Sequence, residues 1–209
     1  MEKLKLCVLV SGGGTNLQAI IDEIEAGKLP ATITCVISNN KNAYALERAK
    51  KYNINNYCIQ KKHFENICAY ENELKRIINQ HACDLIVQAG FLVVLSEGFV
   101  SFFENRIINI HASLIPSFCG KGFYGLNVHE AVLDKGCKIT GATVHFVNSD
   151  IDGGPIILQK CVEVKYDDTP ETLQKRVMVE AEHIILPLAI KLIAENKLII
   201  ENNKVRVVD

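Results

Sequence analysis

The chain of 209 residues carries a formal net charge of −1 and is 48% hydrophobic. This length and composition suffice for a large α/β domain with a buried core. The charge offers no basic surplus for a nucleic-acid partner. No apolar run approaches the roughly 20 residues of a membrane span. We therefore expect a cytoplasmic protein with small-molecule partners and neither a nucleic-acid nor a membrane partner.

Eight cysteines are spread along the chain without a C-x-x-C pair. Several lie inside apolar runs, as Cys7 does between Leu6 and Val8. This pattern is typical of reduced, buried thiols rather than of a disulfide framework or a zinc site. We expect no bound metal, and we expect Cys119, which lies in a loop, to be the most exposed thiol.

The first half of the chain alternates apolar strands with helical patterns, which predicts a parallel sheet covered by helices on both faces. The predicted strands are 6–10, 31–38, 56–59 and 84–89, and the predicted helices are 16–26, 43–52 and 70–81.

The second half adds a strand at 106–110, a loop at 117–125, a helix at 128–135, and strands at 140–147 and 155–165 that we expect to be partly antiparallel. A long helix is predicted from Thr169 to about Glu195, interrupted or kinked at Pro187. A closing hairpin at 198–208 turns at Asn202 and Asn203. The whole pattern predicts a Rossmann-like, mostly parallel twisted sheet in a single domain, 1–209.

A glycine-rich loop, Ser11-Gly12-Gly13-Gly14-Thr15-Asn16, follows the first strand and opens the first helix. Glycines allow close approach of a ligand, and a helix N-terminus offers N–H groups to an anion. Leu17 fills the third glycine position of the dinucleotide fingerprint, and no Walker lysine is present. We interpret the loop as a phosphate site, with a plain strand-to-helix turn as the alternative.

Asn109 and His111 stand two residues apart at the end of the strand predicted at 106–110. Residues i and i+2 of a strand point to the same face. An amide and an imidazole that project together suit a site that stabilises an oxyanion and moves a proton. The pair is therefore the leading catalytic candidate.

Asp152 precedes two glycines and supplies a carboxylate for such a site. A carboxylate beside an imidazole favours the protonated imidazole. An ordinary Asp-Gly turn is the alternative interpretation. His145 lies within a predicted strand, and we expect it to be a structural histidine, with a place in the lining of a site as the alternative. His129 and His183 lie on predicted helices, and we expect them to be structural or to support a site without contacting the substrate.

Five segments closely resemble the phosphoribosylglycinamide formyltransferase family, and they occur in the family's order. They are Ser11-Gly12-Gly13-Gly14-Thr15-Asn16, Ala89-Gly90-Phe91-Leu92, Asn109-Ile110-His111-Ala112-Ser113-Leu114-Ile115-Pro116, Gly141-Ala142-Thr143-Val144-His145-Phe146-Val147 and Asp152-Gly153-Gly154-Pro155. The resemblance implies the formyltransferase fold, with a phosphate-binding half of about 1–105 and a folate and catalytic half of about 106–209.

The resemblance also implies an activity: transfer of a formyl group from 10-formyltetrahydrofolate, as co-substrate, to the amine of 5'-phosphoribosylglycinamide in purine biosynthesis. Carried over by position, Asn109 and protonated His111 stabilise the tetrahedral oxyanion, and His111 supplies a proton to the leaving N10. Asp152 holds His111 charged and helps to take the proton from the amine. No metal is implied, and the oligomeric state is left open between monomer and homodimer.

Binding residues follow from the same resemblance. The ribonucleotide is assigned to Gly14, Thr15, Asn16 and Glu182. The folate is assigned to Leu92, Val93, Val94, Leu95, Asn109, Asn148, Ser149, Asp150, Ile151 and Asp152.

The chain departs from the commonest family pattern in several places, including the following. Ile67 and Val93 stand where many members carry arginines toward the folate's glutamate tail. The loop 117–125 is longer than usual. The helix around Met178 and Val179 has one extra residue, which predicts a local helix bulge.

Two other functions remain open from the sequence. The first is another folate-dependent formyltransferase or a formyltetrahydrofolate hydrolase; members of those groups usually carry an added domain, which we do not expect here. The second is a non-catalytic nucleotide-binding module, which would need the glycine loop but not Asn109, His111 and Asp152.

Overall fold

The computed structural model describes residues 2–208. They form two compact units, Met1–Ile108 and Asn109–Asp209. The boundary falls inside strand β5 (Ile107–His111), close to the expected division between residues 105 and 106. The single domain expected for residues 1–209 stays a prediction.

The first unit contains four parallel strands from the alternating first half of the chain. They are β1 (Leu4–Val10), β2 (Ala31–Ser38), β3 (Asn55–Cys58) and β4 (Leu85–Gln88). β1 pairs in parallel with both β2 and β4, and β2 pairs in parallel with β3. The last five residues of β1, Leu6–Val10, are fully buried, which makes this strand the centre of the unit's core.

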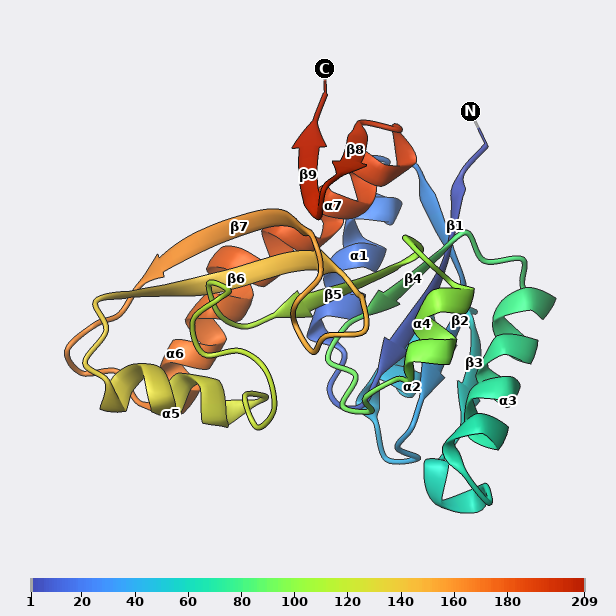
Figure 1. Ribbon diagram of the computed structural model, residues 1–209, viewed down its shortest axis with the longest axis horizontal. Coiled ribbons are helices and arrows are strands. Elements are labelled where there is room, and N and C mark those ends of the chain that lie inside the picture. The colour runs from blue at the N-terminus through green and yellow to red at the C-terminus, as the bar shows by residue number, and fades with distance from the viewer. Residues whose placement is uncertain (1, 209) are drawn as a thin grey trace. The chain divides into compact units, whose positions relative to one another are not determined.

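The helices of the first unit are α1 (Thr15–Glu25), α2 (Tyr44–Lys51), α3 (Ile67–Gln80) and α4 (Glu97–Phe102), with a 3-10 turn at Lys61–His63. In Figure 1, α4 lies in front of the strands of this unit and α2 behind them. α3 begins three residues earlier than predicted because the side chain of Asn66 accepts a hydrogen bond from the Ala69 N–H and caps it. The sequence analysis missed α4, a short helix capped by Ser96.

The second unit contains β5, α5 (Leu126–Asp134), β6 (Ile139–Phe146) and β7 (Ile156–Glu163), then α6 (Pro170–Val177), a π-helical turn (Met178–Glu182) and α7 (His183–Ala194). β6 and β7 pair antiparallel, as predicted. The chain closes with the hairpin β8 (Leu198–Glu201) and β9 (Lys204–Val207). Asn202 and Asn203 both have positive φ at its turn, which confirms the predicted Asn-Asn hairpin.

Within residues 2–208, hydrogen bonding orders the strands β1 to β7 in one sheet as β3-β2-β1-β4-β5-β6-β7, and β8 and β9 form a separate pair. The mixed α/β class with a mostly parallel sheet is therefore confirmed. No helix within residues 2–208 is both long enough and apolar enough to cross a membrane.

The long helix after Thr169 is interrupted at a different place from the one predicted. Thr169 caps α6 through a reciprocal capping box with Thr172, as its sequence indicated. Pro187, however, lies inside α7, and the irregularity is the π-helical turn at Met178–Glu182. An inserted residue widens a helix into such a turn, so the predicted bulge is confirmed. The predicted interruption at Pro187 is wrong, because α7 continues through it, and a kink there stays a prediction.

Candidate active site

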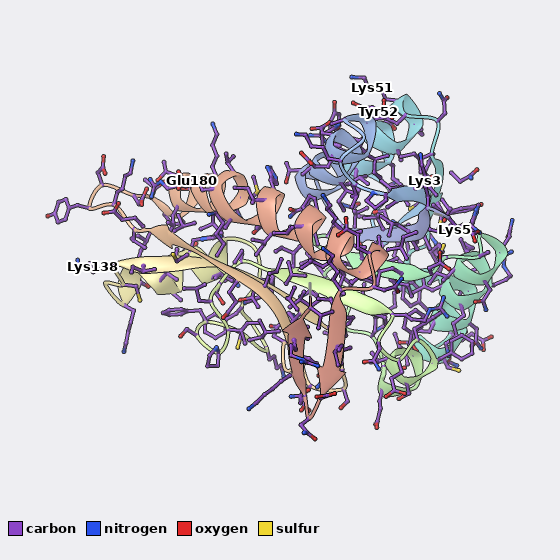
Figure 2. All side chains as sticks on the ribbon, turned by 90° about the horizontal axis from the view of Figure 1, so that it is seen from above. Lys3, Lys5, Lys51, Tyr52, Lys138 and Glu180 are labelled. Atoms are coloured by element: carbon purple, nitrogen blue, oxygen red, sulfur yellow. The ribbon has the colours of Figure 1, made fainter. Side chains whose placement is uncertain are left out.

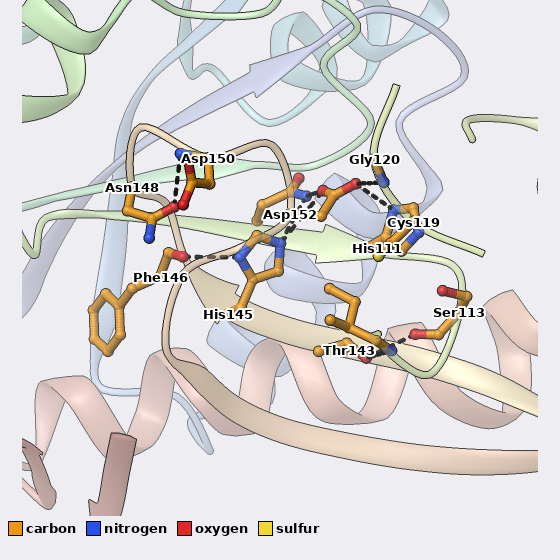
Figure 3. A network of polar contacts seen from close by, with 12 residues as sticks. His111, Ser113, Cys119, Gly120, Thr143, His145, Phe146, Asn148, Asp150 and Asp152 are labelled. Atoms are coloured by element: carbon orange, nitrogen blue, oxygen red, sulfur yellow. Dashed lines mark hydrogen bonds and ion pairs between the residues drawn. The ribbon is translucent and has the colours of Figure 1, made fainter. Parts of the chain in front are cut away.

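Asn109 and His111 lie in the carboxyl-terminal half of β5, and His111 turns toward Asp152 (Figure 3). The amide nitrogen Nδ2 of Asn109 lies 3.5 Å from Oδ1 of Asp152. Nδ1 of His111 lies 3.7 Å from Oδ2 of the same carboxylate. Alternate residues of a strand share a face, and here the shared face brings an amide and an imidazole onto one carboxylate, as the sequence predicted.

Asp152 reaches this position because the turn that carries it needs the two glycines. Its own φ is +56°, a left-handed conformation that Asp tolerates better than most residues. A Cβ on Gly153 would lie 2.7 Å from Cβ of Asp150, and one on Gly154 would lie 1.8 Å from the carbonyl oxygen of Phe146. The backbone here is therefore a turn, as the alternative interpretation stated. The same turn also places the Asp152 carboxylate beside Asn109 and His111.

His145 is a fourth member of the cluster that the sequence analysis assigned to structure. It is buried near the end of β6, where the pairing with β7 shifts register. Its Nδ1–H donates to the carbonyl of Phe146 at 2.8 Å, and its Nε2 lies 3.2 Å from Nδ2 of Asn109 and 3.6 Å from Oδ1 of Asp152. The carbonyl contact determines which nitrogen of His145 faces the cluster.

The longer loop, 117–125, contributes backbone groups to the same cluster. Nε2–H of His111 donates to the carbonyl oxygen of Phe118 at 2.9 Å, and the Gly120 N–H donates to Oδ2 of Asp152 at 2.8 Å. Both contacts are made by main-chain atoms, so the sequence carried no signal for them. The segment that precedes the loop is held by Thr143, whose hydroxyl donates to the carbonyl of Ser113 at 2.7 Å (Figure 3).

The surroundings keep Asp152 ionised. Burial alone raises the pKa of a carboxyl group. Here the hydrogen bond from His145, the charge of His111 and the N–H of Gly120 outweigh burial and lower the pKa of Asp152. The cluster therefore contains a carboxylate flanked by two imidazoles at neutral pH.

His129, which lies on α5, is fully buried beside this cluster and has no hydrogen-bond partner for either ring nitrogen among residues 2–208. Burial, and secondarily the charge of His111, lower the pKa of His129 to about 4. The ring is therefore neutral at pH 7. This supports the expectation that His129 is structural.

The glycine loop lies in the first unit, between β1 and α1. Gly14 has a φ of +71°, and a Cβ there would lie 2.6 Å from Cβ of Ala45. Gly12 and Gly13 have open space where a Cβ would be, so local packing does not require them. Their carbonyls face α2, where they accept from the Ala45 N–H and from Nε of Arg48. Thr15 and Asn16 form the first turn of α1.

The segment Leu92–Leu95 also lies in the first unit, and its side chains are largely accessible. Leu92 is 59% exposed and Val94 is 63% exposed. One end is held by the Ser11 hydroxyl, which accepts from the Leu92 N–H, and the other by Ser96. The buried carboxylate of Glu71 accepts both the N–H and the hydroxyl of Ser96, at 2.6 and 2.5 Å. The backbone of this segment is therefore fixed while its apolar side chains stay exposed.

Glu182 ends the π-helical turn in the second unit and is buried. Glu180, two residues earlier, is exposed on the same turn (Figure 2). Widening the helix by one residue changes which side chains face inward after the insertion. The extra residue near Met178 and Val179 thus coincides with the turn that buries Glu182.

Sequence comparison identifies the family. The sequence model of the family described as formyl transferase matches residues 4–190. The chain belongs to the formyl transferase family. It is 40% identical over 199 residues to the phosphoribosylglycinamide formyltransferase of Haemophilus influenzae, which covers 95% of this chain and 91% of that protein.

This chain spans only a small part of one further relative and nearly all of another. The chain is 42% identical over 193 residues to the trifunctional purine biosynthetic protein adenosine-3 of Bos taurus, and it spans only 18% of that protein. The crystal structure of glycinamide ribonucleotide transformylase 1 from Symbiobacterium toebii matches with a TM-score of 0.93 and 39% identity. That match covers 100% of this chain and 95% of the other.

The predicted site residues of this formyl transferase are divided between the two units of the chain. Asn109, His111 and Asp152 lie together in the second unit, and the turn 148–152 carries Asp152 into the cluster. The glycine loop and Leu92–Leu95 lie in the first unit. One further expectation is wrong: Cys119 is only half-buried by the loop, whereas Cys58, Cys68 and Cys161 are exposed.

Proposed function

We propose that this protein transfers a formyl group from 10-formyltetrahydrofolate to the amine of 5'-phosphoribosylglycinamide, a step of purine biosynthesis. The observation that carries the proposal is the convergence of Asn109, His111 and His145 on the ionised carboxylate of Asp152 in a member of the formyl transferase family. A module that only bound nucleotides would have no need of this cluster. The proposed setting is the cytoplasm.

The reaction breaks the C–N10 bond of the donor and forms a C–N bond to the amine. The amine loses one proton and N10 gains one. Direct attack on the formyl carbon produces a tetrahedral oxyanion, which needs hydrogen-bond donors placed around the developing charge. N10 leaves readily only as a neutral amine, so the site must also supply a proton.

His111 and Asp152 divide the proton work. In the proposed mechanism, protonated His111 donates to N10, and the Asp152 carboxylate keeps the imidazolium charged until then. Asp152 also accepts the proton of the attacking amine, directly or through water. Because its pKa is lowered, Asp152 stays ionised and available at neutral pH.

Asn109 supplies the oxyanion donor. Its amide nitrogen faces His145 and Asp152. Nε2 of His145, 3.2 Å from this nitrogen, positions the amide, and the amide N–H groups are the proposed donors to the oxyanion.

We assign the ribonucleotide phosphate to Gly14, Thr15 and Asn16 at the start of α1, where N–H groups of the first turn suit an anion. The open space over Gly12 and Gly13 supports this assignment. Glu182, a buried acid, is proposed to hold the glycinamide or ribose end of the same substrate.

We assign the folate to the fixed backbone and exposed side chains of Leu92–Leu95 and to the turn from Asn148 through Ser149, Asp150 and Ile151 to Asp152. Ile151 is exposed, as are Leu92 and Val94. Apolar contacts with a few fixed backbone donors and acceptors suit a flat heteroaromatic ring.

The deciding experiment incubates purified protein with 10-formyltetrahydrofolate, with and without 5'-phosphoribosylglycinamide, and measures formylated ribonucleotide and tetrahydrofolate. We expect both products only when the ribonucleotide is present. Release of tetrahydrofolate at the same rate with water alone would reject the transferase in favour of a hydrolase.

A further inference from the structure

Three cysteines from separate parts of the first unit meet in its core, and none of them belongs to the proposed catalytic cluster. Cys7 lies in β1, Cys35 is its register partner in β2, and Cys83 lies two residues before β4. Their three Sγ atoms all lie within 4.8 Å of one another. Sγ of Cys35 is 3.7 Å from Sγ of Cys83. All three side chains are buried, with at most 3% exposure.

This spacing is that of a three-sulfur coordination site. An ion about 2.3 Å from each of three sulfurs in a plane holds them about 4.0 Å apart. A pyramidal arrangement brings the sulfurs closer. We propose that Cys7, Cys35 and Cys83 form a trithiol site for a single trivalent thiophilic ion, of which arsenite is the simplest probe.

Charge selects the trivalent class. Three thiolates around a divalent or monovalent ion leave one or two net negative charges in the core, which is costly to bury. Trivalent arsenic with three thiolates is neutral. Zinc in structural sites needs a fourth ligand, and no fourth His, Cys, Asp or Glu joins the cluster within residues 2–208. The hydroxyl of neighbouring Thr34 already donates to the carbonyl of Leu6.

The binding reaction balances without an oxidant or reductant. Three As–O bonds of arsenous acid break and three As–S bonds form. The three thiol protons leave with the three hydroxides as water, and no oxidation state changes.

Two simpler roles explain less of the geometry. A disulfide between Cys35 and Cys83 would leave Cys7 outside the bond. Plain core packing needs small apolar side chains, and it does not require three sulfurs in mutual contact. The cluster is also separate from the proposed phosphate site: Cys7 precedes Ser11 by four residues of extended strand, about 13 Å.

The test uses the full chain with the other five cysteines replaced by serine (C58S, C68S, C119S, C137S, C161S), so that only the cluster can bind. Arsenite is added, and the intact mass and the arsenic X-ray absorption spectrum are measured. We expect one arsenic per chain, a mass gain of one arsenic less three protons, and three sulfur neighbours. Zinc added alone is expected to be lost on desalting.

The matched controls are C7A and V8A in that same background, two truncations of neighbouring buried residues in β1. C7A is expected to weaken arsenite binding at least about tenfold, and V8A is expected to retain three-sulfur binding. If C7A does not fold, the number of sulfur neighbours in the X-ray absorption spectrum of the five-serine variant still tests the proposal. Fewer than three sulfur neighbours, no bound arsenic, or retention of zinc in its place would each overturn the proposal.

Discussion

At the scale of single residues, the chemistry depends on one carboxylate. Asp152 receives contacts from Asn109, His111, His145 and the Gly120 N–H. Burial raises the pKa of Asp152, but the two histidines and the Gly120 N–H outweigh burial and lower it. A buried carboxylate held by several charged or polar groups is strongly coupled to each of them. A substitution of Asp152 itself should therefore lower turnover, whereas a substitution of a neighbour should change the pH dependence of the reaction.

Replacing Asp152 by Asn should remove the proton acceptor while keeping the size of the side chain. We expect kcat to fall about 10²- to 10⁴-fold. Ribonucleotide affinity should change little, because the residues proposed to bind its phosphate, Gly14, Thr15 and Asn16, do not include Asp152. Steady-state kinetics and calorimetric binding measure the two quantities. Asp134→Asn, at the exposed end of α5, is the matched control; equal turnover of the two variants would remove Asp152 from the mechanism.

Replacing His145 by Phe should shift the pH profile. His145 is a main cause of the lowered pKa of Asp152. Without it the pKa of Asp152 rises, and the carboxylate protonates at a higher pH. We expect the acidic limb of kcat/KM to move to higher pH, in addition to a lower plateau from the less well positioned Asn109. An unchanged limb with a lower plateau would show that His145 acts on Asn109 alone.

At the scale of elements, two turns place functional groups of the proposed site. The turn 148–154 and the glycine loop each place functional groups through backbone geometry that bulkier residues cannot adopt. Only some glycines are required in this way. Gly14 and Gly154 are enclosed, whereas Gly12 and Gly13 are open.

Gly14→Ala and Gly13→Ala should therefore separate folding from binding. Alanine at 14 must adopt a positive φ and displace Ala45, at a cost of about 2–4 kcal/mol in the free energy of unfolding. The Cβ of alanine at 13 would meet no atom within 4 Å, so this variant should keep nearly the same free energy of unfolding. It should bind the ribonucleotide more weakly, because the added methyl group blocks the approach of the phosphate. Urea unfolding and ribonucleotide titration distinguish these effects; equal stability of the two variants would contradict the geometry.

At the scale of the whole molecule, the pH dependence of stability reflects one neutral histidine. The pKa of His129 falls from its ordinary 6.5 to about 4 on folding. Between these values the unfolded chain binds a proton that the folded chain does not. Stability therefore decreases as pH falls through this window, by roughly 3 kcal/mol in total.

Urea unfolding between pH 7 and 4.5 measures this decrease. His129→Phe should flatten the slope, and His63→Gln, an exposed control, should keep it. The scan stops at 4.5 because carboxylates contribute below that point: Asp168, paired with Arg176, has its pKa lowered to about 2 and loses its stabilising effect as pH falls below about 4. A slope that survives His129→Phe would assign the effect to another group.

Much of this protein was determined by its sequence alone. Apolar runs, helix caps and the Asn-Asn turn are local signals, so β2, the start of α6 and the closing hairpin were predicted nearly to the residue. Asn109 and His111 were found because strand alternation is also local. The bulge near Met178 followed from a single extra residue in a family pattern.

Only the tertiary structure decided which distant groups meet. His145 joined the site because β6 places it beside Asn109, and Phe118 and Gly120 joined it through main-chain atoms that any residue carries. Cys7, Cys35 and Cys83 lie too far apart in sequence to form a recognisable motif. Their meeting depends on strand order and register, which arise from long-range pairing rather than from local preference.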